Sequence, residues 1–411
     1  MKNICDIYYE KKLFHIVLDT YEEYKIPQNV MYKTAIAVNL YYIDTVKKYL
    51  TYLNKVPKEI DIYIISSNKL LLSEIEDFAL NRKNVKLIEK ENRGRDISAL
   101  LVIFKHFVKK YKYICFIHDK KPNYDFLKED TDLWVYNLWN NTLKTENYIK
   151  NIIGLLMQED IGMLIPPKPI GDHIDNWYAN VWYKNYDNTI KLAQKLGIGS
   201  NIITEQTPFA LGTVFWAKTK ALEKLFNVEW NYKDFPEEPM PTDGTISHAI
   251  ERILPYIVQD AGYETHVIVS KDYAEKLILI IQKMMEDSFE ALWKRFKIRN
   301  VYQLMHYAEQ ENEVKKIFCN CKHIYLYGTG DYGKRFLELL KLWGYIPNGF
   351  VVTNGYRKET LIEGYPIYEL QELNINESNG FIICTNYHLQ DEIEQLLLSR
   401  GFHHYFKVIL G

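Results

Sequence analysis

The sequence predicts an α/β protein with a mostly parallel, Rossmann-type sheet in its first and larger domain. From residue 34 onward, apolar runs of strand length alternate with amphipathic runs of helix length. This alternation is typical of a parallel sheet covered by helices on both faces. Near the C-terminus, a strand, a glycine-rich turn and a helix follow one another, which predicts a second, small Rossmann-like α/β domain.

The composition is that of an ordinary globular protein. Of 411 residues, 47% are hydrophobic and 25% are charged, and a formal net charge of -2 favours no nucleic-acid partner. The five cysteines form neither a disulfide framework nor a zinc-binding pattern. No apolar signal core and no run of about 18 apolar residues occurs, so we expect a cytoplasmic protein.

The elements of the first domain follow from the period of the apolar residues. The N-terminal extension, 1–33, is charged and amphipathic, and we expect one helix around 14–24. In chain order we then expect strands over 35–40, 61–67, 85–89, 113–117, 162–167 and 208–216, and helices over 46–53, 69–80, 97–108 and 132–143. The aromatic segment 168–205 is expected to be an irregular insertion.

A first polar block, 92–96, follows the third strand and precedes a helix. Arg93 and Arg95 offer fork-shaped donors suited to phosphate or carboxylate, and Gly94 lets the backbone approach a ligand closely. The N-terminal amides of the following helix favour an anion at the same place. Asp96 is equally well explained as the N-cap of that helix.

A second polar block, 118–121, ends the buried strand 113–117. Ligands of open α/β sheets bind beyond the carboxyl ends of the strands, so both blocks point to one site. The alternative is a polar loop that merely ends a strand. Further along, Gly212 lies in a predicted strand, and Asp243 opens a helix on which His248, Glu251 and Arg252 share a face. That face is also consistent with a surface ion pair and a capping histidine.

Four blocks together, 92–96, 118–121, 212–216 and 248–252, resemble the rhamnan synthesis protein F family over about residues 34–270. The resemblance implies a GT-A-like glycosyltransferase of surface polysaccharide, such as rhamnan-type glycan, capsule, O-antigen or cell-wall glycan. It implies a nucleotide-diphosphate sugar donor, dTDP-rhamnose or a UDP-sugar. It also implies a lipid-linked glycan acceptor and peripheral contact with the inner membrane.

Roles for single residues follow from this resemblance. Asp243 is the first choice for the catalytic base and Glu251 the second, unless Glu251 orients Arg252. The expected donor-binding residues are Asn92, Arg93, Gly94, Arg95, Asp96, His118, Asp119, Lys120, Lys121, Gly212, His248 and Arg252. GT-A sites place an Asp-x-Asp on a divalent cation, whereas this strand ends with Asp119 alone, so a requirement for Mg or Mn stays open. Lysines could neutralise the diphosphate instead.

The domain boundaries are expected at 1–33 (extension), 34–270 (GT-A-like domain), 271–320 (helical linker) and 321–411 (Rossmann-like domain). In the last domain Gly328, Gly330 and Gly333 form G-x-G-x-x-G, a second candidate nucleotide site. The acidic residue that reads the ribose is missing from the following strand. Two alternatives to a transferase remain: an NAD-dependent nucleotide-sugar oxidoreductase or epimerase, and a non-catalytic scaffold subunit of a polysaccharide assembly complex.

Overall fold

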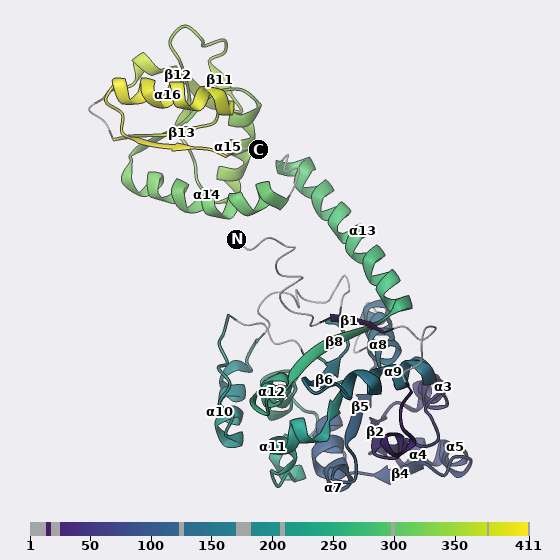
Figure 1. Ribbon diagram of the computed structural model, residues 1–411. Coiled ribbons are helices and arrows are strands. Elements are labelled where there is room, and N and C mark those ends of the chain that lie inside the picture. Colours follow the sequence, from purple (N-terminus) through teal and green to yellow (C-terminus); the bar gives the residue numbers. More distant parts are fainter. Residues whose placement is uncertain are drawn as a thin grey trace. The chain divides into compact units, whose positions relative to one another are not determined.

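The computed structural model describes residues 14–17, 25–122, 127–169, 182–205, 210–296, 301–375 and 378–409. The chain forms two compact units, Met1–Leu277 and Ile278–Gly411, each with its own sheet (Figure 1). Both sheets are mostly parallel and carry many helices, which confirms the predicted α/β class. Within the described ranges, no helix is both long and apolar enough to cross a membrane.

The sheet of the first unit has the order β1-β8-β6-β7-β5-β2-β3-β4 among the described residues. Its strands are β1 Phe14–Val17, β2 Thr34–Asn39, β3 Asp61–Ser66, β4 Val85–Glu89, β5 Tyr113–His118, β6 Ile161–Ile165, β7 Phe215–Lys218 and β8 Glu264–Ser270. Only β7 is antiparallel to its neighbours, β5 and β6, among these pairings. The chain runs from β2 to β4 on one side and returns to β5 on the other side of β2. This reversal creates the switch point at which α/β sheets bind ligands.

Helices cover both faces of this sheet, so β2 and β5 are buried along their whole length (Figure 1). The helices are α2 Gln28–Met31, α3 Val46–Leu53, α4 Lys69–Glu74, α5 Glu76–Leu80, α6 Arg95–Ser98, α7 Lys105–Val108, α8 Lys128–Leu143, α9 Glu146–Leu156, α10 Tyr186–Leu196, α11 Glu223–Phe226 and α12 Ile246–Asp260. A π-helical segment, Ala99–Phe104, joins α6 to α7. Residues of α10 and α12 belong to one core cluster, and residues of α3, α8 and α9 belong to the other.

Three predicted elements of the first unit differ from the observed ones. The helix expected around 14–24 is wrong over Phe14–Val17, which pairs in parallel with Val267–Ser270 at the sheet edge. That partner is remote in sequence, so local periodicity could not reveal it. The strand expected over 208–216 is observed only at its last two residues, in β7, which continues to Lys218; residues 208 and 209 lie outside the described ranges. The segment expected to be irregular contains α10.

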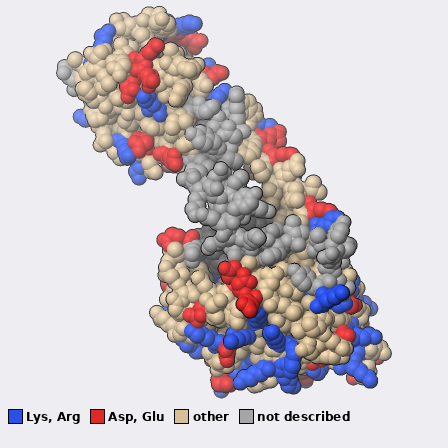
Figure 2. Space-filling model, in the orientation of Figure 1, with Lys and Arg blue, Asp and Glu red and all other residues tan. Residues whose placement is uncertain are grey.

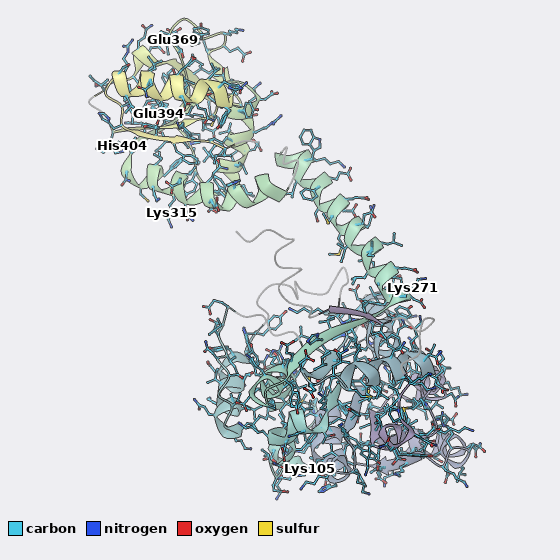
Figure 3. The ribbon with its side chains drawn as sticks, in the orientation of Figure 1. Lys105, Lys271, Lys315, Glu369, Glu394 and His404 are labelled. Carbon is cyan, nitrogen blue, oxygen red and sulfur yellow. The ribbon has the colours of Figure 1, made fainter. Side chains whose placement is uncertain are left out.

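The second unit has a six-stranded sheet of order β11-β12-β10-β9-β13-β14 among the described residues. Its strands are β9 His323–Tyr327, β10 Gly349–Val352, β11 Leu361–Ile362, β12 Tyr365–Glu369, β13 Asn379–Ile383 and β14 His404–Lys407, and its helices are α14 Val301–Asn320, α15 Asp331–Leu342 and α16 Tyr387–Ser399. Helix α13, Lys271–Phe296, begins directly after β8, and Figure 3 labels its first residue. Although the sequence assigned α14 to the linker, its Val314 and Ile317 are buried in the core of the second unit.

Candidate active site

A cavity of about 430 Å³ lies beyond the carboxyl end of β5. The residues that line it come from segments far apart in the chain: α6, the end of β5, α8, the segment before α10, the loop before β7, the loop before α12 and the N-terminal half of α12. Nine of the residues singled out by the sequence line this cavity: Arg95, Asp96, His118, Lys120, Gly212, Asp243, His248, Glu251 and Arg252. The fold therefore brings residues of all four blocks, together with Asp243, to one place.

The peptide groups of Gly212 are held from two sides. Its N–H donates to the Glu251 carboxylate, and its carbonyl oxygen lies 2.7 Å from Nε2 of His118. Gly212 has φ +96°, a conformation that favours glycine. The other ring nitrogen of His118, Nδ1, lies 2.8 Å from the backbone oxygen of Asp119. Glu251 and His118 thus fix the loop that forms one wall of the cavity.

Among the described residues, three cationic side chains line the cavity. Lys120 Nζ lies 4.1 Å from the centroid of the Trp134 ring. Burial lowers the pKa of Lys120, and the neighbouring Asp96 and Glu251 offset only part of that effect. The buried guanidinium of Arg252 donates to the backbone oxygen of His248 and lies 3.6 Å from the Glu251 carboxylate. Arg95 donates to the backbone oxygen of Met240 at 3.2 Å.

The Asp243 carboxylate accepts hydrogen bonds at both of its oxygens. Its Oδ1 accepts from the side-chain amide of Asn185 at 2.6 Å, and its Oδ2 accepts from the backbone N–H of Lys184 at 3.1 Å. Burial raises the pKa of Asp243, but these two hydrogen bonds, one involving Gly244 and the charge of Arg252 outweigh it. The pKa therefore falls below its ordinary value of 3.8, and the carboxylate is ionised at neutral pH.

His248 is neutral at neutral pH because burial lowers the pKa of its imidazole, despite the nearby carboxylates of Glu251 and Asp243. It occupies the third position of α12 and forms a capping box with Thr245. The backbone N–H of Thr245 donates to Nδ1 of His248 at 3.4 Å. In the neutral ring this arrangement leaves the proton on Nε2, which makes His248 a hydrogen-bond donor toward a ligand.

The other residues predicted for this site do not line the cavity. Arg93 donates to the backbone oxygen of Phe235 at 2.7 Å and pairs with Glu237, and Asn92 accepts from Ser67. A Cβ on Gly94 would lie 2.7 Å from the Phe235 ring, so packing rather than ligand approach requires glycine there. Lys121 pairs with Asp44 at 2.6 Å.

Asp119 is committed to the backbone across the switch point. Its Oδ2 accepts from the backbone N–H groups of Tyr41 and Tyr42, both at 2.8 Å, and it is 5% exposed. The described residues hold no cluster of three His, Cys, Asp or Glu side chains that could bind a metal ion. Because Mg and Mn prefer several oxygen ligands, the residues present do not fit a divalent cation at Asp119.

The sequence did not identify Trp134, Tyr183, Ser247 and Asn185 as parts of this site. The first three line the cavity, and Asn185 supports it through Asp243. Asn185 and Asp243 are 58 positions apart. No motif joins them, since the contact depends on how the segment before α10 folds back onto the loop before α12.

A second cavity, of about 870 Å³, is lined by residues from the opposite edge of the same sheet, where β5 begins and β7 ends. Its lining residues include Lys109, Lys112, Lys218 and Lys220. Figure 2 shows Lys and Arg side chains gathered on the part of the first unit that carries α7 and α11 in Figure 1. None of the predicted site residues lines this cavity.

The glycine-rich turn of the second unit has the predicted setting, between β9 and α15. A Cβ on Gly333 would lie 2.0 Å from the backbone oxygen of Gly328, and one on Gly328 would lie 2.8 Å from that of Cys384. A Cβ on Gly330 would meet nothing within 4 Å. Chain packing therefore accounts for two of the three glycines without a bound nucleotide.

Comparison with known proteins places the first unit in a family. A family model described as rhamnan synthesis protein F matches residues 1–263. "Uncharacterized protein WxcX" of Xanthomonas campestris pv. campestris is 25% identical in strain ATCC 33913 and 24% identical in strain B100. Each match covers 43% of this chain, which spans about a quarter of the relative's length, 24% in both cases.

A search of solved structures matches the apo-form glycosyltransferase GlyE of Streptococcus pneumoniae TIGR4. The match is 10% identical and covers 90% of this chain and 100% of that one, with a TM-score of 0.15. A score this low carries no argument about fold or activity.

Proposed function

The chain belongs to the rhamnan synthesis protein F family, and on this premise we propose that it is a glycosyltransferase of surface-polysaccharide assembly. The proposed donor is a nucleotide-diphosphate sugar, dTDP-rhamnose or a UDP-sugar, bound in a GT-A-like domain. The proposed acceptor is a lipid-linked glycan, reached from the cytoplasmic side through peripheral contact with the membrane. Donor, acceptor and location are parts of the proposal.

The observation that carries the proposal is the distribution of charge around the 430 Å³ cavity. Lys120 and Arg252 line the cavity and supply cationic groups. The ionised Asp243 also lines it, on the loop before α12. Cations stabilise the negative charge that develops on a departing diphosphate. A fixed carboxylate can accept the proton of an attacking hydroxyl. Both requirements of sugar transfer are therefore met by side chains around one cavity.

The proposed reaction uses residues of this chain alone. An acceptor hydroxyl oxygen attacks the anomeric carbon of the donor, and its proton passes to the Asp243 carboxylate. The bond between the anomeric carbon and the diphosphate oxygen breaks, and its electron pair leaves with the diphosphate. Lys120 and the Nε2–H of His248 stabilise that leaving group. No step passes through a divalent cation, since Asp119 is bound to the backbone amides of Tyr41 and Tyr42.

A ligand screen tests the proposal against its alternatives. Thermal shifts are measured with dTDP-rhamnose, UDP-glucose, NAD and NADP, and sugar transfer or donor hydrolysis is then followed for any donor that stabilises the protein. We expect stabilisation by a nucleotide sugar. Asp243→Asn should lower the rate about 10²- to 10⁴-fold with donor affinity nearly unchanged. Stabilisation by NAD or NADP alone would contradict the proposal and favour an oxidoreductase.

A further inference from the structure

We propose that Asn185 is the positioning residue of this site: its side chain holds the Asp243 carboxylate ionised and directed at the acceptor hydroxyl. This inference rests on the proposed function in assigning the proton transfer to Asp243. The arrangement of the two side chains, however, is independent of any substrate, so it can be tested without one.

Both polar atoms of the Asn185 side chain are hydrogen-bonded, to the loop that carries Asp243 and to a neighbouring backbone group. Its amide nitrogen donates to Asp243 Oδ1 at 2.6 Å and to the backbone oxygen of Trp182 at 3.1 Å. Its amide oxygen accepts from the backbone N–H of Gly244 at 3.1 Å. One fully buried side chain thus fixes both the carboxylate and the turn that follows it.

The position of Asn185 in the chain makes these contacts unexpected for a purely structural residue. It is the N-cap of α10, where asparagine normally accepts a hydrogen bond from the first turn and stabilises the helix by about 1 kcal/mol. Its side chain makes no such bond to α10. The stabilisation available from capping is forgone, and the side chain is directed to Asp243 and Gly244 instead.

Other charged groups around Asp243 do not replace Asn185. Arg252, His248 and Glu251 come from α12, Arg95 comes from α6, and all line the same cavity. The positive charge of Arg252 favours the ionised carboxylate, but no described hydrogen bond joins the two. Asn185 is the side chain that donates directly to Asp243 within the described part of the chain. Together with the backbone N–H of Lys184, which donates to Oδ2, it sets the direction in which the carboxylate points.

The chain offers a matched control on the same helix. Asn188 donates to the backbone oxygen of Gly244 at 2.9 Å and is not bonded to the Asp243 carboxylate. Asn188→Ala loosens the same turn without removing a donor from Asp243. Asn185→Asp keeps the shape of the side chain but replaces the donated N–H with a second negative charge, and Asn185→Ala removes the amide without adding charge.

The test follows the Asp243 carboxyl directly. Aspartate labelled with ¹³C at the side-chain carboxyl is incorporated into the full chain, and the resonance missing from Asp243→Asn identifies Asp243. We expect its titration midpoint to rise in Asn185→Ala and further in Asn185→Asp, and to stay in place in Asn188→Ala. Where Asn185→Asp does not fold, Asn185→Ala decides. An unchanged midpoint in Asn185→Ala, or an equal rise in Asn188→Ala, would overturn the proposal.

The pH dependence of the transfer rate distinguishes a failure of this inference from a failure of the proposed function. The base acts when ionised, so the rate falls as pH drops through its pKa, and Asn185→Ala should move that acidic limb to higher pH. At pH 7.5 the carboxylate is ionised in both chains, so the rate should fall by roughly up to a hundredfold only because the carboxylate is no longer directed at the acceptor hydroxyl. A wild-type chain that transfers no sugar contradicts the proposed function and leaves the carboxyl titration as the test of Asn185. If the wild-type chain is active but the acidic limb of the pH–rate profile does not move in Asn185→Ala, the role of Asn185 is contradicted and the proposed function is not.

Discussion

Lys120 and Lys121 are neighbours in the sequence but have different surroundings. Lys120 is partly buried against Trp134 in the cavity wall, whereas Lys121 is exposed and paired with Asp44. Lys120→Ala should weaken binding of a nucleoside diphosphate about ten- to hundredfold, because a charge-assisted contact is lost. Isothermal titration calorimetry measures the change, with Lys121→Ala as the matched control. Equal effects of the two substitutions would place the diphosphate elsewhere.

Lys90 gives the first unit a specific dependence on pH. It is 6% exposed and donates to the backbone oxygens of Glu91 and Arg93 and to Ser98, bracing the loop before α6. Burial lowers its pKa from 10.5 to about 8, despite the nearby Asp96, Glu238 and Glu91. Between these two values the unfolded chain binds more protons than the folded one. The contribution of Lys90 to stability therefore rises with pH in this window.

Urea unfolding at pH 7.5 and pH 9.5 checks this dependence against Lys90→Met. The variant loses three hydrogen bonds and should be less stable at both pH values, by about 1–3 kcal/mol at pH 7.5. The difference in unfolding free energy between wild type and Lys90→Met should be larger at pH 9.5. A difference that shrinks as the pH rises would show that Lys90 is not held with a lowered pKa.

At the residue scale, the sequence identified much of the cavity lining but not the direction of each side chain. Arg93 and Arg95 are equivalent in the motif, yet the structure turns Arg93 to Phe235 and leaves Arg95 at the cavity. Asp119 was predicted to be a donor-binding or metal-binding carboxylate, and the sequence did not reveal that its Oδ2 accepts from two backbone amides. These differences depend on loops from other parts of the chain, which residue type and spacing cannot reveal.

At the scale of the elements, the loop before β7 is held by α12 through Glu251 and by the end of β5 through His118. Glu251→Gln keeps an oxygen that can accept from Gly212 but removes the charge beside Arg252. We therefore expect donor affinity and rate to fall together, by about ten- to hundredfold. Calorimetry and initial rates test this expectation. A rate loss with unchanged donor affinity would instead assign proton transfer to Glu251.

The strands of the first unit were predicted best where they are buried on both faces. Strands β2, β3 and β5 are continuous apolar runs bounded by polar residues, so their sequences identify them alone. Strand β1 is short and paired at an edge with the distant β8, which gives no local signal. Helix α10 lies within an aromatic segment, where the apolar period was obscured by the surrounding Trp and Tyr residues.

At the scale of the whole molecule, the cavity is built entirely from residues of the first unit. A chain that ends after α13, at residue 296, should therefore fold and bind a nucleotide sugar as the full chain does. The cut removes α14 together with the second unit, because Val314 and Ile317 of this helix belong to the core of that unit. Circular dichroism checks folding, and calorimetry checks binding. A folded truncated chain that binds no nucleotide sugar bound by the full chain would place the donor site outside the first unit.

A crystal structure of the full chain soaked with UDP or dTDP tests the claim that the cavity beyond β5 binds the nucleotide diphosphate. We expect diphosphate density in this cavity, with phosphate oxygens within hydrogen-bond distance of Lys120 Nζ and with Asn185 still bonded to Asp243. Diphosphate density at the turn of Gly328, Gly330 and Gly333, with none beside Lys120, would contradict the claim.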